Sequence, residues 1–190
     1  MSDFEKLFNP RAVGIIGANN KLFGGGYFLK SLVNFGFKKP LYLFNPRLKG
    51  EKLDGYMVYG SILEVEDDHE IDLVIIAVPA KLCPQILEEC GKKNIPFVTI
   101  FTSGFSEIGN DYLEMEILEI AKKYNIRVIG PNCLGVYVPK KKLTFALGLL
   151  KEHFGNLGII CQSGGLAIYV AAMAQSVYGT NPSKVLSIGN

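Results

Sequence analysis

The sequence lacks three features that would each point to a class of protein. A formal net charge of +2 over 190 residues is too small to favour binding to nucleic acid or to an anionic membrane. The four cysteines contain no Cys-x-x-Cys pair, so neither a zinc site nor thioredoxin chemistry is expected. The longest strongly apolar run, from Leu166 to Ala174, is too short to cross a membrane.

Residues 1–6 also lack the apolar core of a secretory signal. Scattered free thiols in an α/β chain are typical of a reducing cytosol, so we expect a cytoplasmic protein. A hydrophobic content of 48% indicates a globular protein with a sizeable core.

The stretch from Ala12 to Phe35 predicts a strand, a glycine-rich loop and a helix. Residues 12–17 are apolar and rich in β-branched side chains, which indicates a strand buried on both faces. The loop has neither the G-x-G-x-x-G spacing nor a Walker A motif. It is either an anion site at a helix N-terminus, usually for phosphate, or a turn that needs glycine for its geometry. Lys21 adds a cation within it.

A second strand, Leu41–Phe44, ends at Asn45-Pro46-Arg47. In dinucleotide-binding folds this position carries an acid that accepts hydrogen bonds from the ribose. Here Arg47 offers a planar cation suited to a phosphate on that ribose. This favours CoA or NADP over NAD, although an exposed arginine in a turn explains the same residue.

Further strands and helices alternate along the chain. We expect a polar, irregular connection over 49–68, strands at 71–78, 97–101 and 127–130, and helices at 84–93 and 112–124. This alternation predicts an α/β fold, a doubly wound and mostly parallel sheet with helices on both faces. Thr102-Ser103-Gly104 ends one strand, at the edge where such sheets bind ligands.

The composition breaks at Pro139–Leu143, and the pattern then restarts. A strand at 158–161, a loop at 162–165, a helix at 166–176 and a strand at 185–188 are expected. A strand, a helix and a strand cannot form a core of their own. We therefore expect one domain over 1–138, a linker over 139–154 and the truncated start of a second α/β domain over 155–190.

Several motifs together resemble the CoA-binding domain of ADP-forming acyl-CoA synthetases, which are relatives of the succinyl-CoA synthetase alpha subunit. The resemblance covers nearly the whole chain and implies a Rossmann-like first domain followed by a flavodoxin-like second domain. The matching motifs are residues 8–18, Asn45-Pro46, residues 76–80, residues 130–135 and Gln162-Ser163-Gly164-Gly165.

The resemblance also implies the site. Ser163, Gly164 and Gly165 would cradle the phosphate of a phosphorylated histidine. The residues implied in CoA binding are Gly17, Ala18, Asn19, Lys21, Gly24, Gly25, Gly26, Asn45, Arg47, Val78, Pro79, Ala80, Thr102, Ser103, Gly104 and Asn132.

The implied reaction converts acyl-CoA, ADP and phosphate into acid, CoA and ATP, through an acyl phosphate and a phosphohistidine. That histidine would lie further along the second domain, and His153 is not that residue. The ATP-grasp part that handles ATP, ADP and Mg²⁺ is missing too. We therefore expect no catalytic residue and no metal site here. The expected partners are CoA, a small carboxylic acid or its acyl-CoA, an ATP-grasp domain or beta subunit, and further copies in an oligomer.

Two alternatives belong to other functional classes. One is a standalone CoA-binding or regulatory module without catalysis. The other is an NADP-dependent oxidoreductase domain, which Arg47 permits. The missing G-x-G-x-x-G motif and the lack of a recognisable catalytic acid or base count against the oxidoreductase.

Overall fold

The computed structural model describes residues 4–66, 70–149, 154–176 and 180–190, so His69 and His153 lie outside the described residues. The larger of two sheets has the strand order β3-β4-β2-β1-β5-β6-β7. Its neighbouring strands are parallel except for the antiparallel pair β3 and β4. Its strands are β1 (Val13–Ile16), β2 (Leu41–Phe44), β3 (Lys52–Leu53), β4 (Tyr56–Tyr59), β5 (Leu73–Ile76), β6 (Phe97–Ile100) and β7 (Arg127–Ile129).

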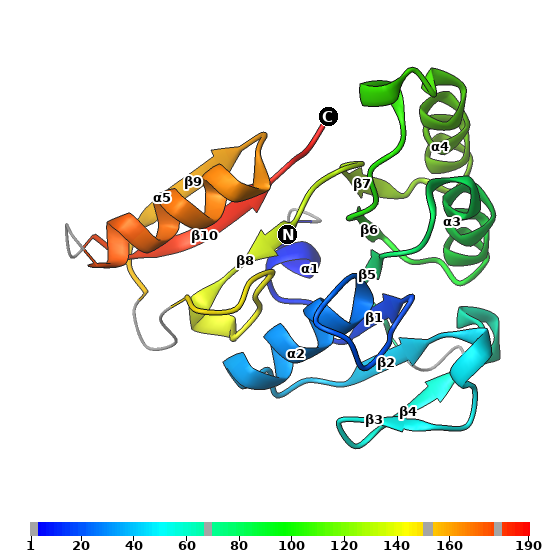
Figure 1. The fold of residues 1–190 in the computed structure, drawn as a ribbon, viewed down its shortest axis with the longest axis horizontal. Helices are drawn as coiled ribbons and strands as arrows, with labels where there is room; N and C mark the ends of the chain where they lie inside the picture. Colours follow the sequence, from blue (N-terminus) through cyan, green and yellow to red (C-terminus); the bar gives the residue numbers. More distant parts are fainter. Residues whose placement is uncertain (1–3, 67–69, 150–153, 177–179) are drawn as a thin grey trace.

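Helices cover both faces of this sheet, as the alternating pattern predicted. α2 (Gly25–Phe35) lies on one side, and α3 (Cys83–Lys92) and α4 (Asp111–Tyr124) lie on the other (Figure 1). Successive side chains of a strand point to opposite faces. Ile15 therefore joins the core cluster of α2, whereas Ile16 joins that of α3 and α4. The predicted α/β fold with a mostly parallel sheet is confirmed.

The prediction of an irregular connection over 49–68 is wrong in part. β3 and β4 form a short hairpin there, and β4 adds a parallel strand beside β2. The turn consists of Asp54 and Gly55, whose φ angles are 49° and 88°. An Asp-Gly pair with positive φ at both residues is a strong signal for a tight hairpin, and it was available in the sequence.

A second, three-stranded sheet has the order β8-β10-β9. β9 (Leu157–Cys161) and β10 (Pro182–Ser187) are parallel and joined by α5 (Gly164–Ser176). β8 (Gly135–Tyr137) runs antiparallel to β10, although it precedes the domain boundary expected at residue 138. We call these four elements the C-terminal unit.

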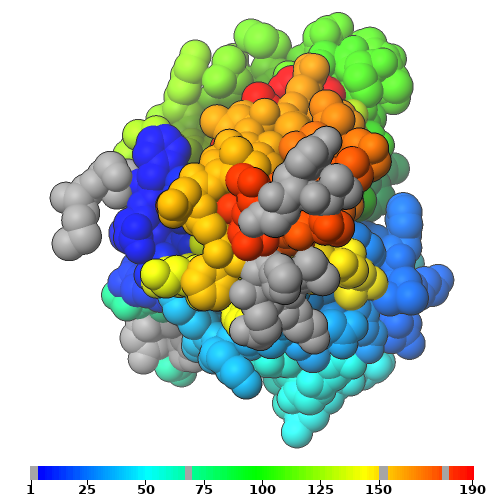
Figure 2. Space-filling view, turned by 90° about the vertical axis from the view of Figure 1, so that its left-hand side faces the viewer, coloured from blue at the N-terminus to red at the C-terminus, as the bar shows by residue number. Residues whose placement is uncertain are grey.

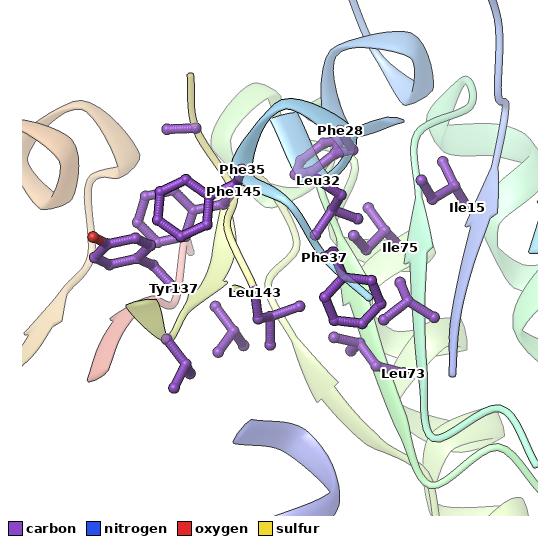
Figure 3. Close-up of a cluster of buried hydrophobic side chains, with 14 of the residues drawn as sticks. Ile15, Phe28, Leu32, Phe35, Phe37, Leu73, Ile75, Tyr137, Leu143 and Phe145 are labelled. Atoms are coloured by element: carbon purple, nitrogen blue, oxygen red, sulfur yellow. The ribbon is translucent and has the colours of Figure 1, made fainter. Parts of the chain in front are cut away.

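The C-terminal unit shares a hydrophobic core with the larger sheet. Tyr137 of β8 is fully buried and lies 5.7 Å from Phe35 of α2 and 5.9 Å from Phe145, measured between ring centroids (Figure 3). Its hydroxyl accepts a hydrogen bond of 2.9 Å from Gln175 of α5. Burial raises the pKa of Tyr137 to about 12, so the hydroxyl stays neutral. Figure 2 shows the orange and red residues of β9, α5 and β10 above the lighter blue residues, with yellow residues between them.

Two further observations concern compartment and membrane. All four cysteines are free thiols. Within the described part of the chain, no helix combines the length and the apolar character that crossing a bilayer requires.

Candidate functional site

The predicted site residues gather at the carboxyl ends of the parallel strands. The chain passes from β1 to β2 on one side and later returns to β5 on the other side of β1. In open α/β sheets a crevice forms at such a switch point, just beyond the strand ends. The loops that follow β1, β2 and β5 meet there.

The glycine loop after β1 is packed too closely for side chains. Gly17 has φ of 85°, and a Cβ on it would lie 2.3 Å from the carbonyl oxygen of Ala77. A Cβ on Gly25 would lie 2.4 Å from the carbonyl oxygen of Gly17, and one on Gly26 would lie 2.1 Å from that of Lys21. The glycines therefore bring the first turn of α2 against the end of β1, with its backbone N–H groups at the positive end of the helix.

Two asparagines of the predicted set support this loop. Asn19 Nδ2 donates to the carbonyl of Gly17 at 3.0 Å, and its Oδ1 accepts from the backbone N–H of Lys21 at 2.8 Å. Asn45 Nδ2 donates to the carbonyl of Ala18 at 2.8 Å, and its Oδ1 accepts from the N–H of Arg47 at 3.0 Å. Both side chains thus shape the site by holding backbone in place.

A cavity of about 510 Å³ opens beside the loop. This volume is in the range of small-molecule sites. Five predicted residues line it together: Gly17, Asn45, Arg47, Val78 and Pro79. The sequence reasoning missed the lining residues that follow β4 or lie on α3, which are Gly60, Ser61, Ile62, Gln85, Ile86 and Glu89. The other lining residues adjoin the predicted ones in the chain or directly precede α3: Ile16, Phe44, Pro46, Ala77 and Leu82.

The predicted residues after β6 and β7 continue along the same edge. Thr102 Oγ1 donates to the carbonyl of Val78 at 2.6 Å. Ala80 and Gly104 are neighbours, since a Cβ on Gly104 would lie 3.3 Å from that of Ala80. The backbone N–H of Asn132 donates to the carbonyl of Thr102 at 2.9 Å. These loops form a continuous path leading away from the cavity, along which Ser103 is exposed.

Glu107, which the sequence reasoning did not single out, holds this path in place. Its carboxylate accepts hydrogen bonds from the backbone N–H groups of Gly104 and Phe105 and, at 2.6 Å, from Asn190 Nδ2. Partial desolvation would raise its pKa, but the bonds from Gly104 and Asn190 outweigh this and lower the pKa. Asn132 Nδ2 also donates to Asn190 Oδ1, at 3.3 Å. Glu107 thus joins the loop after β6 to the segment after β10.

The second predicted anion loop lies at the start of α5. Ser163 Oγ accepts from the N–H of Leu166 at 3.3 Å, which makes Ser163 the N-cap of this helix. A Cβ on Gly164 would lie 2.7 Å from Leu134 Cγ, so the loop packs closely against the segment after β7. Ser163, Gly164 and Gly165 do not line the 510 Å³ cavity.

These features define a class of protein: an α/β domain of Rossmann type, with a glycine loop at a helix N-terminus, a cavity at the switch point and an arginine after β2. A model of the CoA binding domain family matches residues 8–104, slightly more than half of the chain. The chain belongs to the CoA-binding domain family, and the predicted resemblance is confirmed.

Curated relatives and solved structures agree. The chain is 39% identical over 194 residues to acetate–CoA ligase [ADP-forming] I subunit alpha of Pyrococcus furiosus, covering 98% of this chain and 41% of the relative. It is 43% identical over 182 residues to the ADP-forming acetate–CoA ligase of Methanocaldococcus jannaschii, covering 95% of this chain and 25% of the relative.

A solved structure of the dinucleotide forming acetyl-coenzyme A synthetase 1 from Ca. Korarchaeum cryptofilum, in complex with phosphate and ADP, is also similar. It matches with a TM-score of 0.88 and 34% identity, over 100% of this chain and 40% of that one. The chain therefore spans less than half the length of these relatives, and it corresponds to their CoA-binding portion.

Proposed function

We propose that this chain binds CoA as part of an ADP-forming acyl-CoA synthetase. The observation that carries the proposal is the position of Arg47, which lines the 510 Å³ cavity beside the glycine loop. CoA differs from most nucleotides in having a phosphate on the adenosine ribose, and a guanidinium is well suited to bind it.

The site offers a place for each part of CoA. The pyrophosphate lies at the glycine loop, where the N–H groups and the dipole of α2 favour an anion. Lys21 is exposed there and adds positive charge. The adenosine occupies the cavity, with its ribose phosphate at Arg47. The pantetheine arm follows Val78–Ala80 and Thr102–Gly104 towards Asn132.

The remaining expectations depend on the longer protein. The full reaction would convert acyl-CoA, ADP and phosphate into acid, CoA and ATP. Ser163–Gly165, at the N-terminus of α5, would hold the phosphate of a phosphohistidine supplied by a further segment. An ATP-grasp domain or subunit would provide the nucleotide and Mg²⁺ sites, within an oligomer. The small carboxylic acid would be bound largely outside these residues.

Two structural details bear on domain organisation and compartment. We propose domains over 1–138 and 155–190 with a linker over 139–154, although β8 pairs with the C-terminal unit. The four free thiols support a cytoplasmic location.

Calorimetric titration tests the binding proposal. Wild-type protein should bind CoA saturably and in preference to NAD and NADP. Arg47→Glu should weaken CoA binding about 10- to 100-fold, because it removes charge-assisted hydrogen bonds. The same change should have little effect on 3′-dephospho-CoA, which lacks the phosphate.

Arg127→Glu is the matched control. Arg127 begins β7, at the amino end of the sheet and away from the cavity. The Arg127→Glu variant has the same change of charge as Arg47→Glu, and its affinity for CoA should equal that of the wild type. Equal losses for CoA and dephospho-CoA in Arg47→Glu would show that Arg47 does not bind the ribose phosphate. Tighter binding of NADP than of CoA would contradict the proposal and favour the oxidoreductase alternative.

A further inference from the structure

One end of the cavity carries polar groups that the proposed function does not use. The cavity walls include the apolar side chains of Ile62, Leu82 and Ile86. Among the residues that the structure describes along the cavity, the charged ones are Arg47 and Glu89. Arg47 follows β2, whereas Glu89 lies in the second half of α3. A carboxylate in a site for a polyanionic ligand is unfavourable for the phosphates, so it needs a different partner on the ligand.

Hydrogen bonds fix the Glu89 carboxylate. Ser61 Oγ donates to Glu89 Oε2 at 2.8 Å and accepts from the backbone N–H of Leu63 at 3.1 Å. The hydroxyl proton is therefore committed to Glu89. Gln85 Nε2, one helical turn earlier, lies 3.4 Å from Glu89 Oε1, which is a long hydrogen bond.

The Glu89 carboxylate, which lines the cavity, can still accept further hydrogen bonds. An ionised carboxylate has about four acceptor positions and no donor. The Gln85 amide can donate to a ring nitrogen beside it. An exocyclic amine next to a ring nitrogen is the pattern at the six-position edge of adenine. A 6-oxo purine presents an oxygen there, which a carboxylate repels.

We propose that Glu89 accepts a hydrogen bond from the exocyclic amine of the bound base and so selects a 6-aminopurine over a 6-oxopurine. Ser61 is a positioning residue that orients the carboxylate, and Gln85 both orients the carboxylate and donates to the ring nitrogen. The apolar walls bind the faces of the base, and Arg47 binds the phosphate at the other side of the ribose. The inference rests on CoA as the ligand and adds the determinant of base specificity.

The test compares CoA with its deaminated analogue, in which hypoxanthine replaces adenine. Wild-type protein should bind CoA about 10- to 100-fold more tightly, the range expected for hydrogen bonds to a charged group. Glu89→Gln can donate to an oxygen as well as accept from an amine, so the affinity ratio should fall to within about threefold of one. Ser61→Ala should lower the ratio part of the way.

Two controls separate base selection from general damage. Glu88→Gln alters the neighbouring carboxylate of α3, which pairs with Lys123 at 2.7 Å and does not line the cavity. This variant should keep the wild-type ratio. Arg47→Glu should weaken both ligands equally and leave the ratio unchanged.

Each outcome has a separate meaning. Wild-type protein that binds neither ligand overturns the proposed function. Wild-type protein that binds both ligands equally leaves CoA binding standing and overturns the role of Glu89. A wild-type ratio retained in Glu89→Gln does the same.

Discussion

Replacing Gly26 by alanine should disrupt the glycine loop, even though alanine favours helices. Gly26 lies in the first turn of α2, where alanine would ordinarily stabilise the helix by up to about 1 kcal/mol. The added Cβ, however, would lie 2.1 Å from the carbonyl oxygen of Lys21 and 2.6 Å from that of Asn19. Both of these atoms belong to the backbone, so a change of rotamer cannot relieve the overlap.

The geometry sets the size of the effect. Relief of a contact this short requires the loop to move by about 1 Å, and overpacking of this kind costs about 1–3 kcal/mol or more. We expect a net loss of about 2–3 kcal/mol. In a protein of this size that lowers the melting temperature by roughly 5–10 °C. CoA affinity should fall at least about 10-fold, because the N–H groups of α2 and the loop no longer converge.

Calorimetry with CoA and thermal unfolding measure the two effects. Gly158→Ala in β9 is the matched control, since its added Cβ meets no described residue within 4 Å other than its two neighbours in the chain. That variant should bind CoA normally and melt within about 2 °C of wild type, as a substitution away from special features typically does. A Gly26→Ala protein with wild-type affinity and wild-type melting temperature would refute the packing argument.

Two further predictions concern stability and thiol chemistry. The Arg11 guanidinium donates hydrogen bonds of 2.8 and 2.7 Å to the Asp72 carboxylate, which is only 1% exposed. Arg11→Met should therefore lower the free energy of unfolding, measured in urea, by about 2–3 kcal/mol. This lies at the lower end of the cost of breaking a buried ion pair, because water reaches the half-exposed arginine. Burial raises the pKa of Cys83 to about 11 and that of Cys133 to about 12. Both stay protonated at pH 8, so a disulfide reagent should modify the half-buried Cys161 in the folded protein and all four thiols after unfolding.

Matched variants check both predictions. Glu70 also pairs with Arg11 but is 59% exposed, so Glu70→Gln should cost less than about 0.5 kcal/mol. If Arg11→Met lowered the free energy of unfolding no more than Glu70→Gln does, the argument from the buried Asp72 carboxylate would be wrong. Cys161→Ser should abolish the fast thiol reaction, and a fast reaction that survives would place a reactive thiol among the buried cysteines.

Strands β1, β2, β5, β6 and β9 were predictable because each is a short apolar run, and Leu41–Phe44 was predicted to the residue. β8 was missed because a strand of only three residues is too short to show an alternating pattern of side chains. The site residues that end β1, β2 and β5 could be located because parallel strands end at a common edge. Glu89 could not be located in this way, because its place in the cavity depends on how α3 packs beside the segment after β4, a contact between distant parts of the chain.

The hydrogen bonds of Glu107 have a thermodynamic consequence. This one carboxylate binds the loop after β6 and, through Asn190, the segment after β10. If the proposed sites bind their ligands, a group bound against Gly104 would change the affinity for a ligand at the start of α5, and that ligand would change the affinity at Gly104 by the same factor, since coupling between two sites is reciprocal. The proposed sites on the two sheets would thus be energetically linked through the hydrogen bonds of one side chain.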